Sequence, residues 1–140
     1  WVHATTAAKH MMFWDHSGLD DRNRISASDM VKVLQKTGWD GPLRELMKEI
    51  KFHDKHGRPL KNQAIKVHAK TGTLNFISAL AGYVDPPKGR KLIFAIFSGD
   101  LPRRAHIPES QKERPRGERS WNLRAKRLQQ QLIERWVAVY

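Results

Sequence analysis

Residues 67–76 read VHAKTGTLNF, and this stretch decides how the rest of the chain is interpreted. Up to Lys70, apolar and polar side chains alternate, and a two-residue period of this kind predicts a half-buried β-strand. The stretches 78–84 and 91–98 are also short and rich in β-forming residues, and turn formers separate them. Three consecutive strands with short links predict an antiparallel meander.

Helical patterns precede the meander. Ser26 has the character of an N-cap for a helix over residues 27–37, where apolar side chains recur at helical spacing. Pro42 suits the first turn of a second helix, which we expect to end near Phe52. Upstream of both, residues 11–14 (MMFW) form a short apolar run that predicts a buried strand.

Prolines and charges dominate residues 101–119, so we expect an extended connector there. Helical periodicity then returns after Ser120. The apolar side chains that define this periodicity are Trp121, Ala125, Leu128, Leu132 and Trp136. One apolar stripe predicts a terminal helix packed on the sheet. The expected fold class is therefore α/β (α+β), in a single domain formed by residues 1–140.

The composition favours an anionic partner. The chain has 140 residues, 26 Lys and Arg against 14 Asp and Glu, and a formal net charge of +12. Nucleic acid, anionic lipid or an acidic polymer would each complement such a charge. Cysteine is absent, which excludes disulfides and thiol catalysis. No apolar stretch is long enough to predict a membrane span.

The tripeptide Lys-Thr-Gly occurs twice, at residues 36–38 and at residues 70–72. The first copy stands where the helix over residues 27–37 must end, and a lysine followed by glycine is ordinary chemistry for a helix C-terminus. The second copy lies on a predicted strand, which Gly72 weakens unless another backbone must come close. A substrate that pairs along the strand edge would supply that reason.

The second copy and its surroundings resemble a known family. Residues 67–84 and 89–97 are similar to the end of the penicillin-binding D-alanyl-D-alanine carboxypeptidase/endopeptidase family, and residues 15–26 resemble an earlier segment of it. The blocks follow the family's order, and the resemblance spans residues 13–100. It implies a β-lactamase/transpeptidase-like domain, of which residues 1–140 would be the C-terminal part.

The resemblance also implies an activity. Members of this family cleave D-Ala-D-Ala bonds of peptidoglycan stem peptides through a serine acyl-enzyme, and they need no metal or organic cofactor. Lys70 and Thr73 would be catalytic, through the ammonium group of Lys70 and the backbone N–H of Thr73 as an oxyanion donor. Thr71, Gly72 and Thr73 would bind substrate. A preference for carboxypeptidase or endopeptidase action stays open.

Two further motifs of the family, Ser-x-x-Lys and Ser-x-Asn, should precede the Lys-Thr-Gly strand. The chain contains no Ser-x-x-Lys. Residues 120–122 match Ser-x-Asn but follow the strand, so we interpret Ser120 as a helix N-cap instead. We therefore expect a missing N-terminal part to supply the nucleophile, and the 140 residues alone to be inactive.

The expected partners are peptidoglycan peptides, β-lactams and that missing part, in the periplasm. The alternative is a non-catalytic basic module that binds nucleic acid or an anionic polymer, because residues 102–140 hold ten Lys and Arg against four Glu. No helix-turn-helix, zinc-finger or RNA-binding signature accompanies this charge, so nucleic acid is not the expected partner. His53 and His56 share a loop with Gly57 but lack an obvious third ligand, so no metal site is expected.

Overall fold

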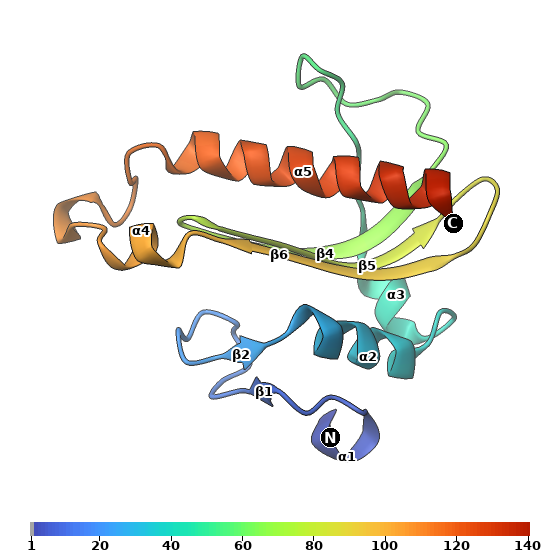
Figure 1. Cartoon of the computed structure of the whole chain (residues 1–140), viewed down its shortest axis with the longest axis horizontal. Helices are drawn as coiled ribbons and strands as arrows, with labels where there is room; N and C mark the ends of the chain where they lie inside the picture. Colours follow the sequence, from blue (N-terminus) through green and yellow to red (C-terminus); the bar gives the residue numbers. More distant parts are fainter. Residues whose placement is uncertain (1) are drawn as a thin grey trace.

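The predicted strands form one antiparallel sheet in the computed structural model, which describes residues 2–140 (Figure 1). Its long strands are β4 (Lys66–Leu74), β5 (Ile77–Asp85) and β6 (Leu92–Gly99), and the short strand β3 (Lys48–Glu49) pairs with the outer side of β4. The strand order β3-β4-β5-β6 has no crossover, so the predicted meander is confirmed.

β4 and β5 approach each other closely at the pair formed by Ala69 and Gly82. A Cβ atom on Gly82 would lie 2.1 Å from the carbonyl oxygen of His68, which is far inside contact distance. Only glycine fits at this position, because the missing side chain lets the two backbones pair at this register.

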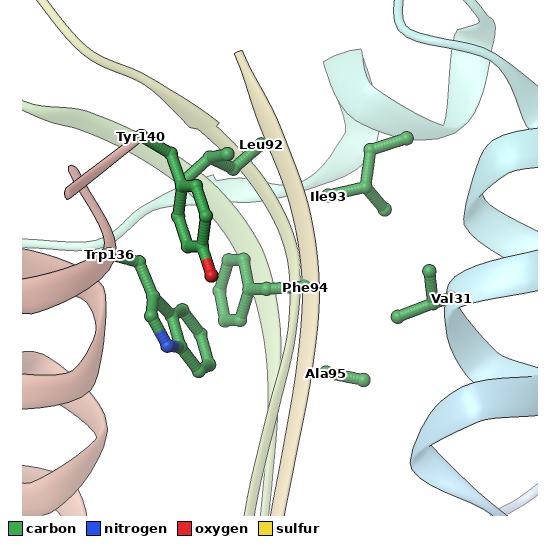
Figure 2. Close-up of a pocket in the computed structure, with 7 residues that line it drawn as sticks. All are labelled: Val31, Leu92, Ile93, Phe94, Ala95, Trp136 and Tyr140. Carbon is green, nitrogen blue, oxygen red and sulfur yellow. The ribbon is translucent and has the colours of Figure 1, made fainter. Parts of the chain in front are cut away.

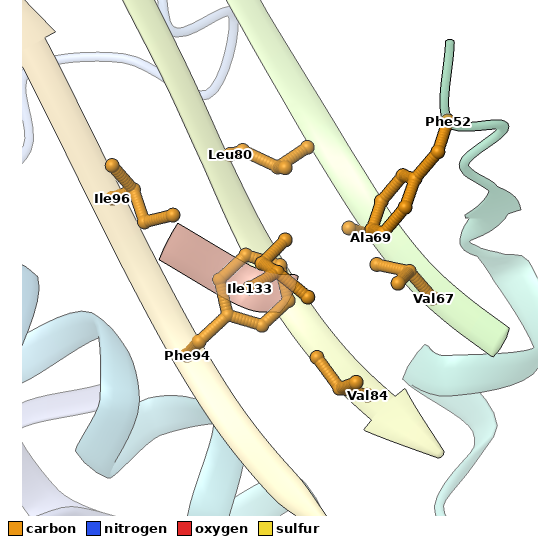
Figure 3. Packing of buried hydrophobic residues seen from close by; sticks show 8 residues of the cluster. All are labelled: Phe52, Val67, Ala69, Leu80, Val84, Phe94, Ile96 and Ile133. Atoms are coloured by element: carbon orange, nitrogen blue, oxygen red, sulfur yellow. The ribbon is translucent and has the colours of Figure 1, made fainter. Parts of the chain in front are cut away.

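The terminal helix α5 (Glu118–Val139) covers one face of the sheet (Figure 1). Its Ile133 is fully buried over Phe94, Leu80 and Val84 in the main hydrophobic core (Figure 3). The other members of this core are Phe52, Val67, Ala69 and Ile96. The predicted fold class, an α+β arrangement with a C-terminal helix on an antiparallel sheet, is confirmed.

The predicted stripe of α5 is partly wrong. The buried side chains are Asn122, Ala125, Gln129 and Ile133, which follow one another at steps of three and four residues. Leu128 is 48% exposed because its direction differs by about 100° from that of the buried Gln129. Two polar side chains thus occupy the stripe, and an apolar pattern could not reveal them.

Helix α2 (Ala27–Thr37) packs on the opposite face, and its predicted bounds are confirmed. The hydroxyl of Ser26 accepts a hydrogen bond of 3.0 Å from the N–H of Asp29, as expected for an N-cap. Gly38 ends the helix with a φ of 81°, a left-handed value that favours glycine. The first Lys-Thr-Gly copy is therefore a helix terminus.

The second predicted helix is shorter than expected. Helix α3 (Pro42–Leu46) ends because Met47 is extended, and β3 follows at once. Lys48 and Glu49 pair with Ala69 and His68 of β4. The hydrogen bonds of this ladder outweigh the helical periodicity of the sequence, and only the presence of a neighbouring strand makes them possible.

The N-terminal segment contains α1 (Val2–Thr5), β1 (Met11–Met12) and β2 (Arg24–Ile25). The prediction of a buried strand at 11–14 is wrong in its burial: Met11 is buried, but the other three side chains are between 52% and 56% exposed. β1 pairs only with β2, so its apolar side chains lack the covering layer that burial requires.

The predicted extended connector contains two short helices, α4 (Leu101–Ala105) and the 3₁₀ helix η1 (Glu109–Gln111). The side chain of Asp100 caps α4, and Pro102 stands in its first turn, so the proline starts a helix here. The N-cap of α5 is Gly117, and Ser120 lies inside the helix, where its hydroxyl donates to the carbonyl of Gly117. None of the helices formed by residues 2–140 is long and apolar enough to cross a bilayer.

Candidate functional site at the free edge of β4

The second Lys-Thr-Gly copy lies where β4 loses its outer neighbour. β3 pairs with β4 only at His68 and Ala69, and the N–H of Ile50 donates to the carbonyl of Val67 at 2.8 Å. From Lys70 onward, no strand formed by residues 2–140 pairs with the outer side of β4. Because backbone direction alternates with a period of two, Thr71 and Thr73 direct their N–H and C=O groups to this free edge, like Val67.

The strand separates the four predicted site residues into two pairs. The side chain of Lys70 points to the face that carries α2, as a side chain at Gly72 would, and those of Thr71 and Thr73 lie on the face that carries α5. All four residues are exposed. The ammonium group of Lys70 donates to the carbonyl of Thr71 at 2.7 Å. The edge of the strand is the place at which both pairs can contact one ligand.

A cavity of about 180 Å³ opens beside this edge, between β4 and α5. Thr71 and Thr73 line it together with Ser78, Lys126 and Gln129. Gln129 is 4% exposed, and its amide donates to the hydroxyl of Ser78 at 3.1 Å, which fixes both side chains in the cavity wall. The sequence reasoning missed the contribution of α5, because no local motif predicts which polar residues of a helix face a strand edge.

Packing within the chain does not require glycine at position 72. A Cβ atom there would meet only the Cβ of Ala79, at an ordinary contact distance of 3.4 Å. This contrasts with Gly82, where the neighbouring backbone excludes any side chain. The absence of a side chain at Gly72 leaves the surface beside the free edge low and accessible.

Comparison with known proteins identifies the family. Residues 3–114 match the D-Ala-D-Ala carboxypeptidase 3 (S13) family, which is four fifths of the chain. The chain belongs to this family. The match includes both the segment 15–26 and the Lys-Thr-Gly strand at 70–72. No curated protein and no solved structure matches the chain.

In this S13 chain, the acidic loop before α2 is bonded internally. The hydroxyl of Ser17 and the amide of Asn23 both donate to the carboxylate of Asp15, and these two bonds hold the pKa of Asp15 below its usual range. The guanidinium of Arg22 donates to the carboxylate of Asp20, and this bond lowers the pKa of Asp20. Ser17 thus donates to a carboxylate acceptor, which is the arrangement of a turn and not of an activated nucleophile.

The histidine-containing loop after β3 is likewise organised by its own hydrogen bonds. Backbone N–H groups of Arg58 and His56 donate to Asp54, and the pKa of Asp54 is lowered chiefly by the bond from Arg58. Within residues 2–140, no three His, Asp or Glu side chains lie close enough together to hold a metal ion.

The opposite edge of the S13 sheet is also open. β6 has β5 on one side and no strand of residues 2–140 on the other. A cavity of about 270 Å³ follows this edge, with Trp136 and Tyr140 of the α5 end on one side of β6 and Val31 of α2 on the other (Figure 2). The lining is apolar on both sides, and the β6 segment (LIFAIFSG) carries no charged residue that would discourage pairing.

Proposed function

We propose that this chain forms the Lys-Thr-Gly side of the active site of a serine-type D-Ala-D-Ala carboxypeptidase or endopeptidase. The observation that carries the proposal is the position of residues 70–73 on an unpaired strand edge, in a chain of a peptidase family. A strand edge binds an extended peptide through main-chain hydrogen bonds, and the stem peptide of peptidoglycan is such a ligand.

Each residue at the edge has a role in this reaction. The substrate backbone pairs with the outward groups of Thr71 and Thr73, over the low surface left by Gly72. The N–H of Thr73 donates to the carbonyl oxygen that becomes an oxyanion. The ammonium group of Lys70 and the threonine hydroxyls attract the terminal carboxylate of the peptide. Lys70 must then exchange its present bond to the Thr71 carbonyl for the substrate.

The covalent step needs a serine from outside residues 1–140, since these contain no Ser-x-x-Lys. The serine oxygen attacks the carbonyl of the penultimate D-Ala and loses its proton to a neighbouring base. The C–N bond breaks, and the terminal D-Ala leaves as an amine. Water then hydrolyses the ester and releases the shortened peptide. Neither step requires a metal or an organic cofactor.

The free edge of β6 is the proposed contact with the part of the enzyme that supplies this serine. A strand added there would satisfy the unpaired backbone groups of β6 and fill the apolar cavity beside Trp136. The part of the enzyme that supplies the nucleophile would then share a sheet with Lys70. Peptidoglycan peptides lie outside the cytoplasm, so the proposed location is the periplasm, and β-lactams are proposed ligands because they mimic the D-Ala-D-Ala end.

Labelling with a fluorescent penicillin tests the proposal. The chain of 140 residues should give no covalent adduct by denaturing electrophoresis and intact mass, whereas the same chain joined to a Ser-x-x-Lys part of an S13 enzyme should be labelled stoichiometrically. A stoichiometric adduct on the 140 residues alone would reveal an unrecognised nucleophile. Absence of label from the joined protein would contradict the proposed function.

The alternative function, binding of an anionic polymer without catalysis, rests on the outer surface of α5. None of the ion pairs within residues 2–140 involves the exposed cations of this helix. These cations are Arg119, Arg124, Arg127 and Arg135, whereas Lys126 lines the cavity beside β4. A gel shift with mixed-sequence DNA at low and at physiological salt would test this alternative, because binding by unpaired cations weakens as salt rises.

A further inference from the structure

The turn that ends the Lys-Thr-Gly strand is bonded to a distant segment at every residue. The carbonyl of Leu74 accepts from the amide of Asn122 at 3.3 Å, and the carbonyl of Asn75 accepts from the guanidinium of Arg104 at 3.0 Å. The carbonyl of Phe76 accepts from the backbone N–H of Asp100 at 2.9 Å. Three successive carbonyls thus have donors from residues 100–122.

The side chains of the same turn are held by the same segment. The amide of Asn75 donates to the carbonyl of Lys112 at 2.7 Å. The ring of Phe76 is 1% exposed, with the ring of Trp121 edge-on at 6.3 Å between centroids and the guanidinium of Arg103 over it at 4.3 Å. The turn is therefore anchored through its backbone and through its side chains.

This anchoring has a conformational reason. Phe76 has a φ of 57°, a left-handed value that a bulky side chain adopts only at a cost in free energy. Asn75 and Phe76 form the whole link between β4 and β5, and neither is glycine. Such a turn keeps its geometry only if its surroundings compensate for the strain, and residues 100–122 provide those contacts.

The segment is itself closed by a contact at the start of α5. The guanidinium of Arg103 donates to the carbonyl of Arg116 at 2.9 Å, just before Gly117. A Cβ atom on Gly117 would lie 2.6 Å from Nη2 of Arg103, and Gly117 has a φ of 81°. The positive φ favours glycine there, and any added side chain would also have to displace the guanidinium of Arg103. The segment that the sequence indicated as an extended connector is thus folded back on the turn.

We propose that residues 100–122, the turn strap, position the end of the Lys-Thr-Gly strand, and that Arg104 and Asn122 are positioning residues for the N–H of Thr73. Thr73 directly precedes Leu74, whose carbonyl Asn122 holds. A turn free to move would displace the Thr73 N–H relative to the substrate carbonyl, and misplacement by about 1 Å can cost about 100-fold in rate. The role of the strap in catalysis rests on the proposed function, whereas its role in holding the turn after β4 does not.

Amide hydrogen exchange of the 140-residue chain tests the role of the strap in holding this turn. In Arg104→Ala and in Asn122→Ala, exchange at Leu74 and Ile77, the pair that closes the turn, should accelerate by about tenfold or more, as expected for loss of one hydrogen bond. Amides of Val67 and Val84, at the other end of the hairpin, should keep their protection. Arg104→Lys retains a hydrogen-bond donor, so exchange at Leu74 and Ile77 should be slower in this variant than in Arg104→Ala. This comparison still tests the contact if Arg104→Ala lowers the stability of the whole fold.

Arg114→Ala is the matched control, because Arg114 is an exposed arginine of the same segment and takes part in none of the contacts above. It should leave all of these amides unchanged. If neither Arg104→Ala nor Asn122→Ala alters exchange at Leu74 and Ile77 relative to this control, the strap does not exist as proposed.

The catalytic role needs the chain joined to its nucleophile. There, Arg104→Ala should lower the rate constant of acylation by a penicillin by about tenfold or more, while the dissociation constant of the non-covalent penicillin complex stays unchanged. Arg104→Lys should restore part of the rate. Faster exchange with an unchanged acylation rate would overturn the positioning role and leave a purely structural strap. No acylation of the unmodified joined protein would refute the proposed function, whatever the exchange results.

Discussion

The hydroxyl of Thr37 lies 3.0 Å from the phenol oxygen of Tyr83, and the phenol also donates to the carbonyl of Leu34 at 3.0 Å. Thr37 belongs to the first Lys-Thr-Gly copy, at the end of α2, and Tyr83 is a fully buried residue of β5. The first copy therefore joins a helix to the sheet, whereas the second copy lies on an open strand edge. The same tripeptide thus occupies two different structural positions in one chain.

Removing the phenol oxygen should weaken this joint. Tyr83→Phe keeps the ring, which packs edge-on against Trp39, but loses a buried hydrogen-bonding group. The free energy of unfolding, measured with urea, should fall by about 1–2 kcal/mol. Tyr140→Phe is the control, since Tyr140 is 62% exposed, and it should change stability by less than about 0.5 kcal/mol. Equal effects of the two changes would exclude the joint.

The two lysines of the repeated tripeptide should contribute differently to acylation when this chain is joined to the part that supplies the nucleophile. Lys70→Ala removes the ammonium group at the free edge, and the rate of acylation by penicillin should fall by about 100-fold. Lys36→Ala removes an exposed side chain in the last turn of α2 and should leave acylation unchanged. Neither change should alter stability by more than about 0.5 kcal/mol, because both lysines are exposed. A larger kinetic effect at Lys36 would show that the wrong copy was assigned.

The backbone donor at Thr73 can be tested separately from its hydroxyl. Thr73→Ala keeps the N–H, whereas Thr73→Pro removes it at a strand edge where it makes no bond within the sheet. Acylation should therefore be slower in the proline variant than in the alanine variant by about 100-fold to 1000-fold. Exchange rates of Leu74 and Ile77 in both variants would reveal whether the turn stays intact. Similar acylation rates in two intact variants would rule out the N–H as an oxyanion donor.

Asp29 should make the stability of the fold sensitive to acid. Its carboxylate is fully buried and accepts from Lys32 at 2.8 Å and from the N–H of His10 at 2.7 Å. The bond from Lys32 contributes most to lowering the pKa of Asp29 from 3.8 to about 2. The folded state thus favours the ionised form, so this stabilisation is complete above pH 3.8 and disappears as the pH falls through about 2.

Denaturation curves of the wild type and of Asp29→Asn between pH 7 and pH 2 would measure this effect. The wild type should be the more stable protein at pH 7, and the difference should shrink steadily below about pH 4. A difference that stays constant down to pH 2 would mean that Asp29 contributes through packing and not through its charge.

Short-range chemistry explains which elements the sequence predicted well. The bounds of α2 follow from the Ser26 cap and from Gly38, both of which act within a few residues. The meander follows from alternation and from turn formers between the strands. The helix predicted to reach Phe52 failed because β3 depends on β4, a partner about twenty residues away that no local pattern identifies.

In the candidate site, too, some features follow from local sequence and others only from the tertiary structure. The sequence by itself determined that Lys70, Thr71, Gly72 and Thr73 share a strand, because the two-residue period and the family pattern are both local properties of the chain. Only the tertiary structure decided that the pairing of β3 with β4 ends at Ala69 and leaves these residues at an open edge. It also decided that Gln129 of α5 lines the adjacent cavity and that Arg104 and Asn122 hold the turn after the strand. These contacts join residues 29 to 51 positions apart, and packing of the whole sheet against α5 selects them.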